Sequence, residues 1–256
     1  MSIQQLERFK ILVVGDNCDD TYVYGTVDRL SPETPVPVLK QTKIVTKNGM
    51  VGNVVDNLKQ LGCNVDMCSN CPSQIQKTRY VDERSGYHLL RVDSETTVDS
   101  WDMETPDPID TYDAIVISDY NKGFVDYRHI EDLRETFSGP MFLDTKKTDL
   151  AAFDGIFVKI NELEYNRSNS INDQLIVTLG SRGAMYKTKH ETYFSAPKVE
   201  VFDVCGAGDT FLSALTYRYL QTQDVSNSIE FAIKASSITV THNGNYAPTL
   251  EEIYAA

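Results

Sequence analysis

The sequence of 256 residues is poor in features that point to nucleic-acid or membrane binding. It has 24 Lys and Arg against 37 Asp and Glu, which gives a formal net charge of −13. Nucleic acids and anionic membrane surfaces are bound by basic patches, so we expect neither as a partner. The longest apolar runs, at Ile11–Val14 and Ala114–Ile117, are strand-sized, far below the ~20 residues that cross a bilayer. Any anion site must therefore be local.

Cysteine is also scarce. The chain has five, an odd number, and it is long enough to bury a core without disulfides, which is typical of a reducing compartment. The first ten residues, MSIQQLERFK, lack the apolar segment of a secretory signal, so we expect a cytoplasmic protein. Cys68 and Cys71 have the spacing of a zinc or redox pair, but no second pair follows and a structural zinc site needs four ligands. Ordinary packing is the favoured interpretation.

Short apolar runs alternate with stretches of helical periodicity, which predicts a mostly parallel sheet with helices on its faces. Helices are expected at 52–61, 126–137 and 209–220. The expected strands are Lys10–Val14, Asn64–Cys68, Ala114–Ser118, Met141–Asp144, Ile156–Lys159 and Leu175–Thr178. The chain is therefore predicted to form a single α/β domain over residues 1–256.

Two stretches, approximately 20–47 and 77–93, break this rhythm. The first contains Pro32, Pro35 and Pro37 among β-branched residues, and proline restricts a strand to the edge of a sheet. The second alternates around Ser85-Gly86, which predicts a β-hairpin. Together they predict a small antiparallel β-lid inserted within the domain. The segment 101–110 is acidic and contains proline, so we expect a surface connection there.

The strongest local signal is DVCGAGDTF at 203–211. Glycines directly before a helix let backbone N–H groups converge on an anion, with help from the helix dipole. Asp209, at the start of that helix, could accept a proton from a hydroxyl while the amides hold a developing charge. The alternative is structural, with Asp209 as a helix N-cap and the glycines as a tight turn. A Gly-x-Gly pair alone does not decide between them.

Further segments occur in an order that resembles the ribokinase/PfkB family of carbohydrate kinases, whose C-terminal signature is similar to GAGDTF. GDNCDDTYVY at 15–24 and RLSPETPVPV at 29–38 resemble the N-terminus of bacterial heptose 7-phosphate kinases, the kinase half of ADP-heptose synthases. The others are KTRY at 77–80, LRVDSE at 90–95, SDYNKG at 118–123, DTK at 144–146, NELE at 161–164 and TLGSRG at 178–183. The resemblance covers nearly the whole chain. It implies a three-layer ribokinase-like fold and an ATP-dependent kinase of a sugar or sugar phosphate.

The resemblance also implies roles for individual residues. Asp209 would be the catalytic base, and the backbone of Gly206, Ala207 and Gly208 would form the anion hole for the transferred phosphoryl group. The implied nucleotide-binding residues are Asn161, Glu164, Thr178, Gly180, Gly183, Lys146 and Asn243. Asn161 and Glu164 would also place Mg²⁺ through water. The implied substrate-binding residues are Asp20, Gly49, Asn53 and Arg79.

Three departures from the family pattern keep other hypotheses open. Met50 stands where the family has the second glycine of a pair, and it lacks the conformational freedom of glycine. The chain between Cys68 and Lys77 lacks a helix–strand unit of its relatives, and only a short link joins Glu164 to Leu175. The alternatives are a kinase of a hexose, pentose or nucleoside, and a non-catalytic sugar- or nucleotide-binding descendant. The retained GAGD and NELE motifs favour a kinase.

Several polar residues allow two interpretations. The basic residues of the expected lid would either clamp a phosphate on the substrate or form a solvated edge that discourages strand pairing. They are Arg29, Lys40, Lys43, Arg79 and Arg91. Asp119, in SDYNKG, would either support the sugar or form a turn at the end of a strand. By resemblance, the lid also serves for homodimerisation.

Overall fold

The computed structural model describes residues 8–256, and within them the largest feature is a sheet of eight strands. Its strand order is β12-β11-β10-β9-β8-β7-β1-β4. In that order the strands are Glu191–Phe194, Ala184–Lys187, Leu175–Thr178, Phe157–Asn161, Met141–Thr145, Ala114–Asp119, Lys10–Gly15 and Asn64–Ser69. The pairings from β4 to β10 are parallel, whereas β11 and β12 are joined by antiparallel pairings. The strands expected from the sequence are confirmed.

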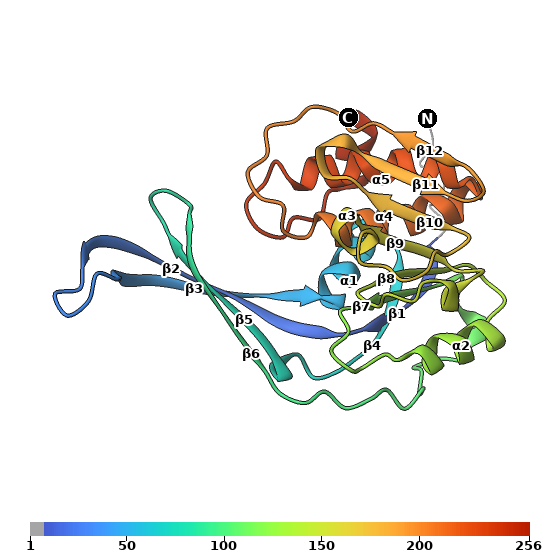
Figure 1. The fold of residues 1–256 in the computed structure, drawn as a ribbon, viewed down its shortest axis with the longest axis horizontal. Helices are drawn as coiled ribbons and strands as arrows, with labels where there is room; N and C mark the ends of the chain where they lie inside the picture. Colours follow the sequence, from blue (N-terminus) through green and yellow to red (C-terminus); the bar gives the residue numbers. More distant parts are fainter. Residues whose placement is uncertain (1–7) are drawn as a thin grey trace.

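Helices cover both faces of this sheet, which gives three layers (Figure 1). One face carries α1 (Val51–Gln60), α4 (Ala207–Thr222) and α5 (Val225–Thr239), and α6 (Leu250–Ala255) contacts α5. The other face carries α2 (Tyr127–Thr136), and α3 (Glu162–Tyr165) is a single turn after β9. The three expected helices are confirmed, although α4 begins at Ala207, two residues before its expected start. Among residues 8–256, no helix is both long and apolar enough to cross a membrane.

The pattern of β1 explains the two cores on either side of the sheet. Ile11 and Val13 face the side of α1 and α4, while Leu12 and Val14 face the side of α2. All four side chains are fully buried. A parallel strand that is covered on both faces is apolar at successive positions, which is why this run shows no polar alternation.

A second sheet of four strands, which we call the lid, projects from the side of the main body (Figure 1). Its order is β3-β2-β5-β6, with β3 at Pro37–Met50, β2 at Asn17–Leu30, β5 at Ile75–Asp82 and β6 at His88–Glu95. The hairpins β2–β3 and β5–β6 are antiparallel. The central pair β2–β5 is parallel and sets Asp20 beside Lys77 and Tyr22 beside Arg79. As the prolines predict, β3 lies at an edge of this sheet.

The chain between β6 and β7 packs against the α2 face of the main sheet without regular structure. The Trp101 side chain is buried, and its ring stacks on Phe124 with the centroids 6.3 Å apart. Its Nε1 donates a hydrogen bond of 3.1 Å to the carbonyl oxygen of Glu104. The expectation of a surface connection over 101–110 is therefore wrong at Trp101, because burying a large indole ring stabilises the segment against the core.

Candidate active site

Most of the site residues predicted from the sequence converge where the parallel strands end and α4 begins. A cavity of about 550 Å³ opens there. Ligands of open α/β sheets bind at this end of the strands. The lining contains the predicted residues Lys146, Asn161, Thr178, Gly180, Gly206, Gly208 and Asp209. Among the lining residues that were not predicted, Tyr120, Asp144 and Lys159 carry polar groups close to Asp209.

The start of α4 is a glycine turn that suits an anion. Gly206 is the N-cap residue and has a φ of 75°, a left-handed conformation that favours glycine. A Cβ atom on Gly206 would lie 2.8 Å from Nδ2 of Asn53, so a larger residue would displace that amide. Ala207 and Gly208 follow in the first turn, where the amide groups of a helix have no intrahelical partner. Together with the helix dipole, these amides favour a bound phosphoryl group.

Asp209 lies in the first turn of α4, and both of its carboxylate oxygens are hydrogen-bonded. Nδ2 of Asn53, on α1, donates to Oδ2 at 2.8 Å. The phenol of Tyr120 donates to Oδ1 at 3.1 Å. Burial raises the pKa of Asp209 and the nearby Asp144 charge adds to this, while the two hydrogen bonds and the Lys159 charge act in the opposite direction. The interpretation of Asp209 as a helix N-cap is wrong, because Gly206 occupies that position.

A buried ion pair lies directly beside this turn. Nζ of Lys159, on β9, is 2.6 Å from Oδ2 of Asp144, on β8, and both side chains are at least nine-tenths buried. A Cβ atom on Gly208 would lie 2.9 Å from the same ammonium, so a larger residue would require the Lys159 side chain to shift. Oδ1 of Asp144 is buried without a hydrogen-bond partner among the described residues. This atom is free to accept a hydrogen bond from a ligand or from ligand-bound water.

The NELE segment, at 161–164, forms one wall of the cavity. We call this wall the donor side, because the resemblance places the phosphate donor there. Oδ1 of Asn161 accepts from the N–H of Glu164 at 2.9 Å, and Oε2 of Glu164 accepts from the N–H of Asn161 at 2.8 Å. This reciprocal capping box starts α3 and holds both side chains in place. The other Glu164 oxygen pairs with the ammonium of Lys146. The charge of Asp144 and the pairing with Glu164 together raise the pKa of Lys146 against the opposing effect of burial.

The predicted substrate residues lie where the lid joins the main body. Asp20, on β2, is 4% exposed and accepts from Nε of Arg79 at 3.0 Å and from its Nη2 at 3.4 Å. Gly49 lies against Cys18, whose sulfur would be 2.5 Å from an added Cβ atom. Asn53 links this side to the cavity through its bond to Asp209. Of the five basic lid residues named above, Arg79 forms an ion pair with a predicted site residue, Asp20, and within residues 8–256 it is the one that does so.

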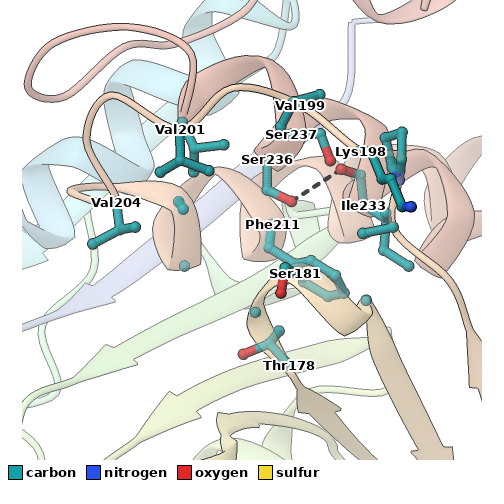
Figure 2. A pocket seen from close by; sticks show the side chains of 17 residues that line it. Thr178, Ser181, Lys198, Val199, Val201, Val204, Phe211, Ile233, Ser236 and Ser237 are labelled. Carbon is teal, nitrogen blue, oxygen red and sulfur yellow. Dashed lines mark hydrogen bonds between the residues drawn. The ribbon is translucent and has the colours of Figure 1, made fainter.

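A second pocket of about 500 Å³ adjoins the cavity and shares Thr178, Gly180, Val204 and Gly208 with it. Its remaining wall is mostly apolar, with Val199, Val201, Phe211, Ile233 and Val240. Figure 2 shows Val199, Val201 and Val204 on the segment that leads into α4, across the pocket from Thr178 and Ser181. Gly183 also lines this pocket, and an added Cβ atom there would lie 2.8 Å from the backbone N of Ala196. A mostly apolar pocket with a few polar groups is the usual lining of a small-molecule site.

The structure does not bring Asn243 to that pocket. Asn243 instead lines a cavity of about 320 Å³ between the body and the lid residues Tyr22, Tyr24 and His88. The neighbouring N–H of Gly244 donates to Asp203 at 3.0 Å, which ties this loop to the segment before α4 on the lid side. The expectation of a nucleotide contact at Asn243 is therefore not met by its position.

Comparison with known proteins agrees with this geometry. Residues 126–252 match the pfkB family of carbohydrate kinases. The chain is 30% identical to the bifunctional protein HldE of Hyphomonas neptunium. The alignment is 312 positions long and covers 96% of this chain and 63% of that protein. The second half of the chain therefore carries a pfkB family domain. It spans just under two thirds of the length of the curated relatives it matches.

Solved structures extend the likeness to the whole fold. Phosphofructokinase-2 from Escherichia coli superimposes with a TM-score of 0.72 at 16% identity, covering 97% of both chains. Ribokinase from Arabidopsis thaliana, solved with ribose and ATP, gives a TM-score of 0.69 at 15% identity and covers 97% of this chain and 98% of its own. The three-layer ribokinase-like fold with a small additional sheet, expected from the sequence, is confirmed.

The oxygen donors of this site fit Mg²⁺. Carboxylate and amide oxygens are the ligands that Mg²⁺ prefers, and it keeps several waters when phosphates share its coordination. Asn161 and Asp144 line the cavity, and Oδ1 of Asp144 is an unpartnered acceptor there. Glu164, bonded to Asn161 through the capping box, would supply a further carboxylate beside them. Within residues 8–256 no three His, Cys, Asp or Glu side chains cluster to hold a metal by themselves. A magnesium ion here would therefore be held jointly with phosphates and water.

Two buried carboxylates outside the cavity support the loop between β7 and α2. Asp119 accepts from Nζ of Lys147 at 2.7 Å, from the hydroxyl of Thr145 at 2.5 Å and from the N–H of Asn121 at 2.8 Å. Of its two interpretations, the structure therefore favours the turn at the end of a strand. Asp16 accepts three backbone N–H groups of the same loop. Lys159 and Asp144 could have been recognised as site residues from the sequence, because each is a charged residue in an otherwise apolar strand. Nothing in the sequence around Tyr120 or Asp16 indicated a role at the site.

Proposed function

We propose that this chain is an ATP-dependent sugar kinase whose preferred acceptor is a sugar phosphate of the heptose 7-phosphate type. The observation that carries the kinase proposal is the position of Asp209. A buried carboxylate directly follows an anion-binding glycine turn, in a cavity that shares lining residues with an apolar pocket. A base, an anion hole and a nucleotide site are the parts that phosphoryl transfer requires.

In the proposed reaction Asp209 accepts the proton of the acceptor hydroxyl as the hydroxyl oxygen attacks the γ-phosphorus of ATP in line. The bond between the γ-phosphorus and the bridging β-phosphate oxygen breaks, and ADP leaves. The amides of Gly206, Ala207 and Gly208 hold the oxygens of the transferred group, where negative charge accumulates. Lys146 approaches the phosphates when Glu164 releases it. Mg²⁺, when bound, neutralises phosphate charge beside Asn161 and Glu164. Thr178, Gly180 and Gly183 lie along the nucleotide.

The charged residues where the lid joins the main body, which we call the acceptor side, support an anionic sugar as the acceptor. Arg79 is already neutralised by Asp20, with which it forms a two-point contact. Lys77, the neighbour of Asp20 across the β2–β5 pair, forms no ion pair among the described residues. Its ammonium lies 5.3 Å from the centre of the Tyr120 ring, whose hydroxyl contacts Asp209. An unpaired cation this close to the proposed base would attract a second anionic group on the acceptor.

The lid also supports a proposed homodimer. The register across the lid aligns Ile44, Val23, Tyr80 and Leu90 in one row on the face opposite Tyr22 and Arg79. Ile44 and Leu90 are more than half exposed. A flat apolar row on an exposed sheet is typical of an interface. A Leu90→Glu variant should sediment as a monomer where the wild type sediments as a dimer.

A cytoplasmic location is supported by ATP as donor and by five free cysteines.

The experiment measures ADP release with Mg·ATP over heptose 7-phosphate, hexose phosphates, neutral hexoses, pentoses and nucleosides. Turnover is expected with the sugar phosphates. Asp209→Asn should lower kcat by about a thousandfold while ATP binding persists. Lys77→Met should raise KM for a sugar phosphate by about tenfold or more and leave neutral sugars unchanged. Lys40→Met is the matched control, because Lys40 is an exposed lysine of the same sheet away from the cavity.

The outcomes separate the three hypotheses. Equal turnover of neutral and phosphorylated sugars, insensitive to Lys77→Met, would contradict the anionic acceptor and favour another pfkB-family kinase. No ADP release with any of the sugars, together with thermal stabilisation by ATP or a sugar, would favour the non-catalytic descendant. Met50, in a backbone conformation that favours glycine at the acceptor side, is the observation that keeps this last candidate open.

A further inference from the structure

Tyr120 is bound directly to the proposed base yet has no role in the mechanism above. Its phenol donates to Oδ1 of Asp209 at 3.1 Å, and the two residues are 89 positions apart. Asn53 takes the other carboxylate oxygen. Burial and the charge of Asp209 raise the pKa of Tyr120 well above its ordinary value, so the phenol stays a donor at neutral pH.

The loop that carries Tyr120 is anchored at its backbone. The buried carboxylate of Asp16, directly after β1, accepts the N–H groups of Tyr120 at 2.8 Å, Lys122 at 3.1 Å and Phe124 at 3.3 Å. Three hydrogen bonds to one charged acceptor hold this turn in one conformation. The phenol is therefore presented to Asp209 from a rigid support.

The ring of Tyr120 also joins the two substrate sides. The ammonium of Lys77, from lid strand β5, lies 5.3 Å from the ring centre. The ammonium of Lys146, from the donor side, lies 5.2 Å from the same centre. Cations at this distance from an aromatic ring are attracted to it. Tyr120 thus touches the acceptor side, the donor side and the base at once.

We infer that Tyr120 is a positioning residue that orients the Asp209 carboxylate and keeps it ionised in a buried site. The inference rests on the proposed function, in which Asp209 is the base. One phenol and one amide each occupy one lone pair of a carboxylate oxygen, which leaves the remaining lone pairs for the acceptor hydroxyl. Without the phenol, a desolvated carboxylate holds its proton more firmly and rotates more freely about its Cβ–Cγ bond.

Other charges near Asp209 act on it as well, and a test must leave them unchanged. Asp144 on β8 favours the protonated form, while Lys159 on β9 favours the ionised form. Lys146 on the donor side and the Cys18 thiol on β2 also interact with the Asp209 charge. Tyr120→Phe keeps the ring between the two lysines and removes only the phenol oxygen, so it disturbs none of these groups.

The test compares Tyr120→Phe with Tyr127→Phe. Tyr127 is the matched control, since its ring also faces a lysine ammonium, Lys147 at 5.6 Å, and stacks on Phe153 away from Asp209. For Tyr120→Phe we expect kcat to fall about ten- to hundredfold, which is the loss of one hydrogen bond to a charged group. The acid limb of the pH–kcat profile should move to higher pH by about one unit. KM for ATP should change less than threefold, and Tyr127→Phe should resemble the wild type.

A measurement without turnover separates this inference from the proposed function. The Asp209 carboxyl carbon, assigned by its loss in Asp209→Asn, can be titrated by NMR in wild type and Tyr120→Phe. A higher midpoint in Tyr120→Phe supports the inference even if every sugar is silent and the proposed function fails. An unchanged midpoint, or an unchanged kcat and acid limb in an active enzyme, overturns it.

Discussion

Met50 offers a direct measurement of stored backbone strain at the acceptor side. It is the N-cap residue of α1, with φ 52° and ψ −127°, a combination that residues with a Cβ atom rarely adopt. Such a residue costs about 1–3 kcal/mol. It persists because the side chain is 4% exposed and packs in the core on the α2 side of the sheet. Truncating a buried Met costs about 2–5 kcal/mol, which exceeds the strain.

Replacing Met50 by alanine and by glycine separates these two terms. Both variants lose the buried side chain, but only glycine relieves the backbone. Relative to alanine, glycine lowers the free energy of unfolding by about 0.4–1 kcal/mol, because the unfolded chain with glycine has more conformational freedom. We therefore expect Met50→Gly to have a free energy of unfolding about 1 kcal/mol higher than that of Met50→Ala, with both below the wild type.

The assay is urea denaturation with linear extrapolation of the unfolding free energy. Val55 is the control position, because it is also buried but lies in the interior of α1, where glycine is less stable than alanine by about 1 kcal/mol. The order of the two variants should therefore reverse between positions 50 and 55. If Met50→Gly is no more stable than Met50→Ala, the backbone at Met50 stores no strain and this reasoning is wrong.

Three further variants test the site. Asp209→Asn should raise Tm at pH 8, because it removes a carboxylate that burial disfavours. Burial raises the pKa of Asp209, so the wild type loses stability as pH rises through that ionisation, and the gain should shrink toward pH 4 in a thermal melt series. A gain independent of pH would contradict this. Gly206→Ala should lose about 1–2 kcal/mol in urea denaturation and most phosphoryl transfer, because its Cβ displaces Asn53; wild-type ADP release would refute the displacement. Lys159→Met should lose about 3–5 kcal/mol by leaving Asp144 unpaired, and adding Asp144→Asn should restore part of that stability rather than lower it further.

Short-range signals in the sequence predicted most of the fold. The continuous apolar run of β1 predicted a strand covered on both faces, and the prolines around position 35 predicted an edge strand. The glycines of GAGD predicted an anion turn before α4, since a left-handed backbone and bare amides are local properties. Family resemblance supplied the roles that we propose for Asn161 and Glu164, and the capping box that joins them is itself local.

The tertiary structure alone decided which side chains meet at the proposed base. The sequence of Asn53 and Tyr120 contains nothing that points to Asp209, and the bonds that join them to it span 156 and 89 positions. They form because the strand order β8-β7-β1 brings the ends of non-consecutive strands beneath one helix turn. The parallel pairing of β2 with β5 likewise sets Lys77 beside Asp20. Local chemistry determined what each segment could become, whereas the packing of distant segments determined the environment, and hence the pKa, of the group that we propose as the base.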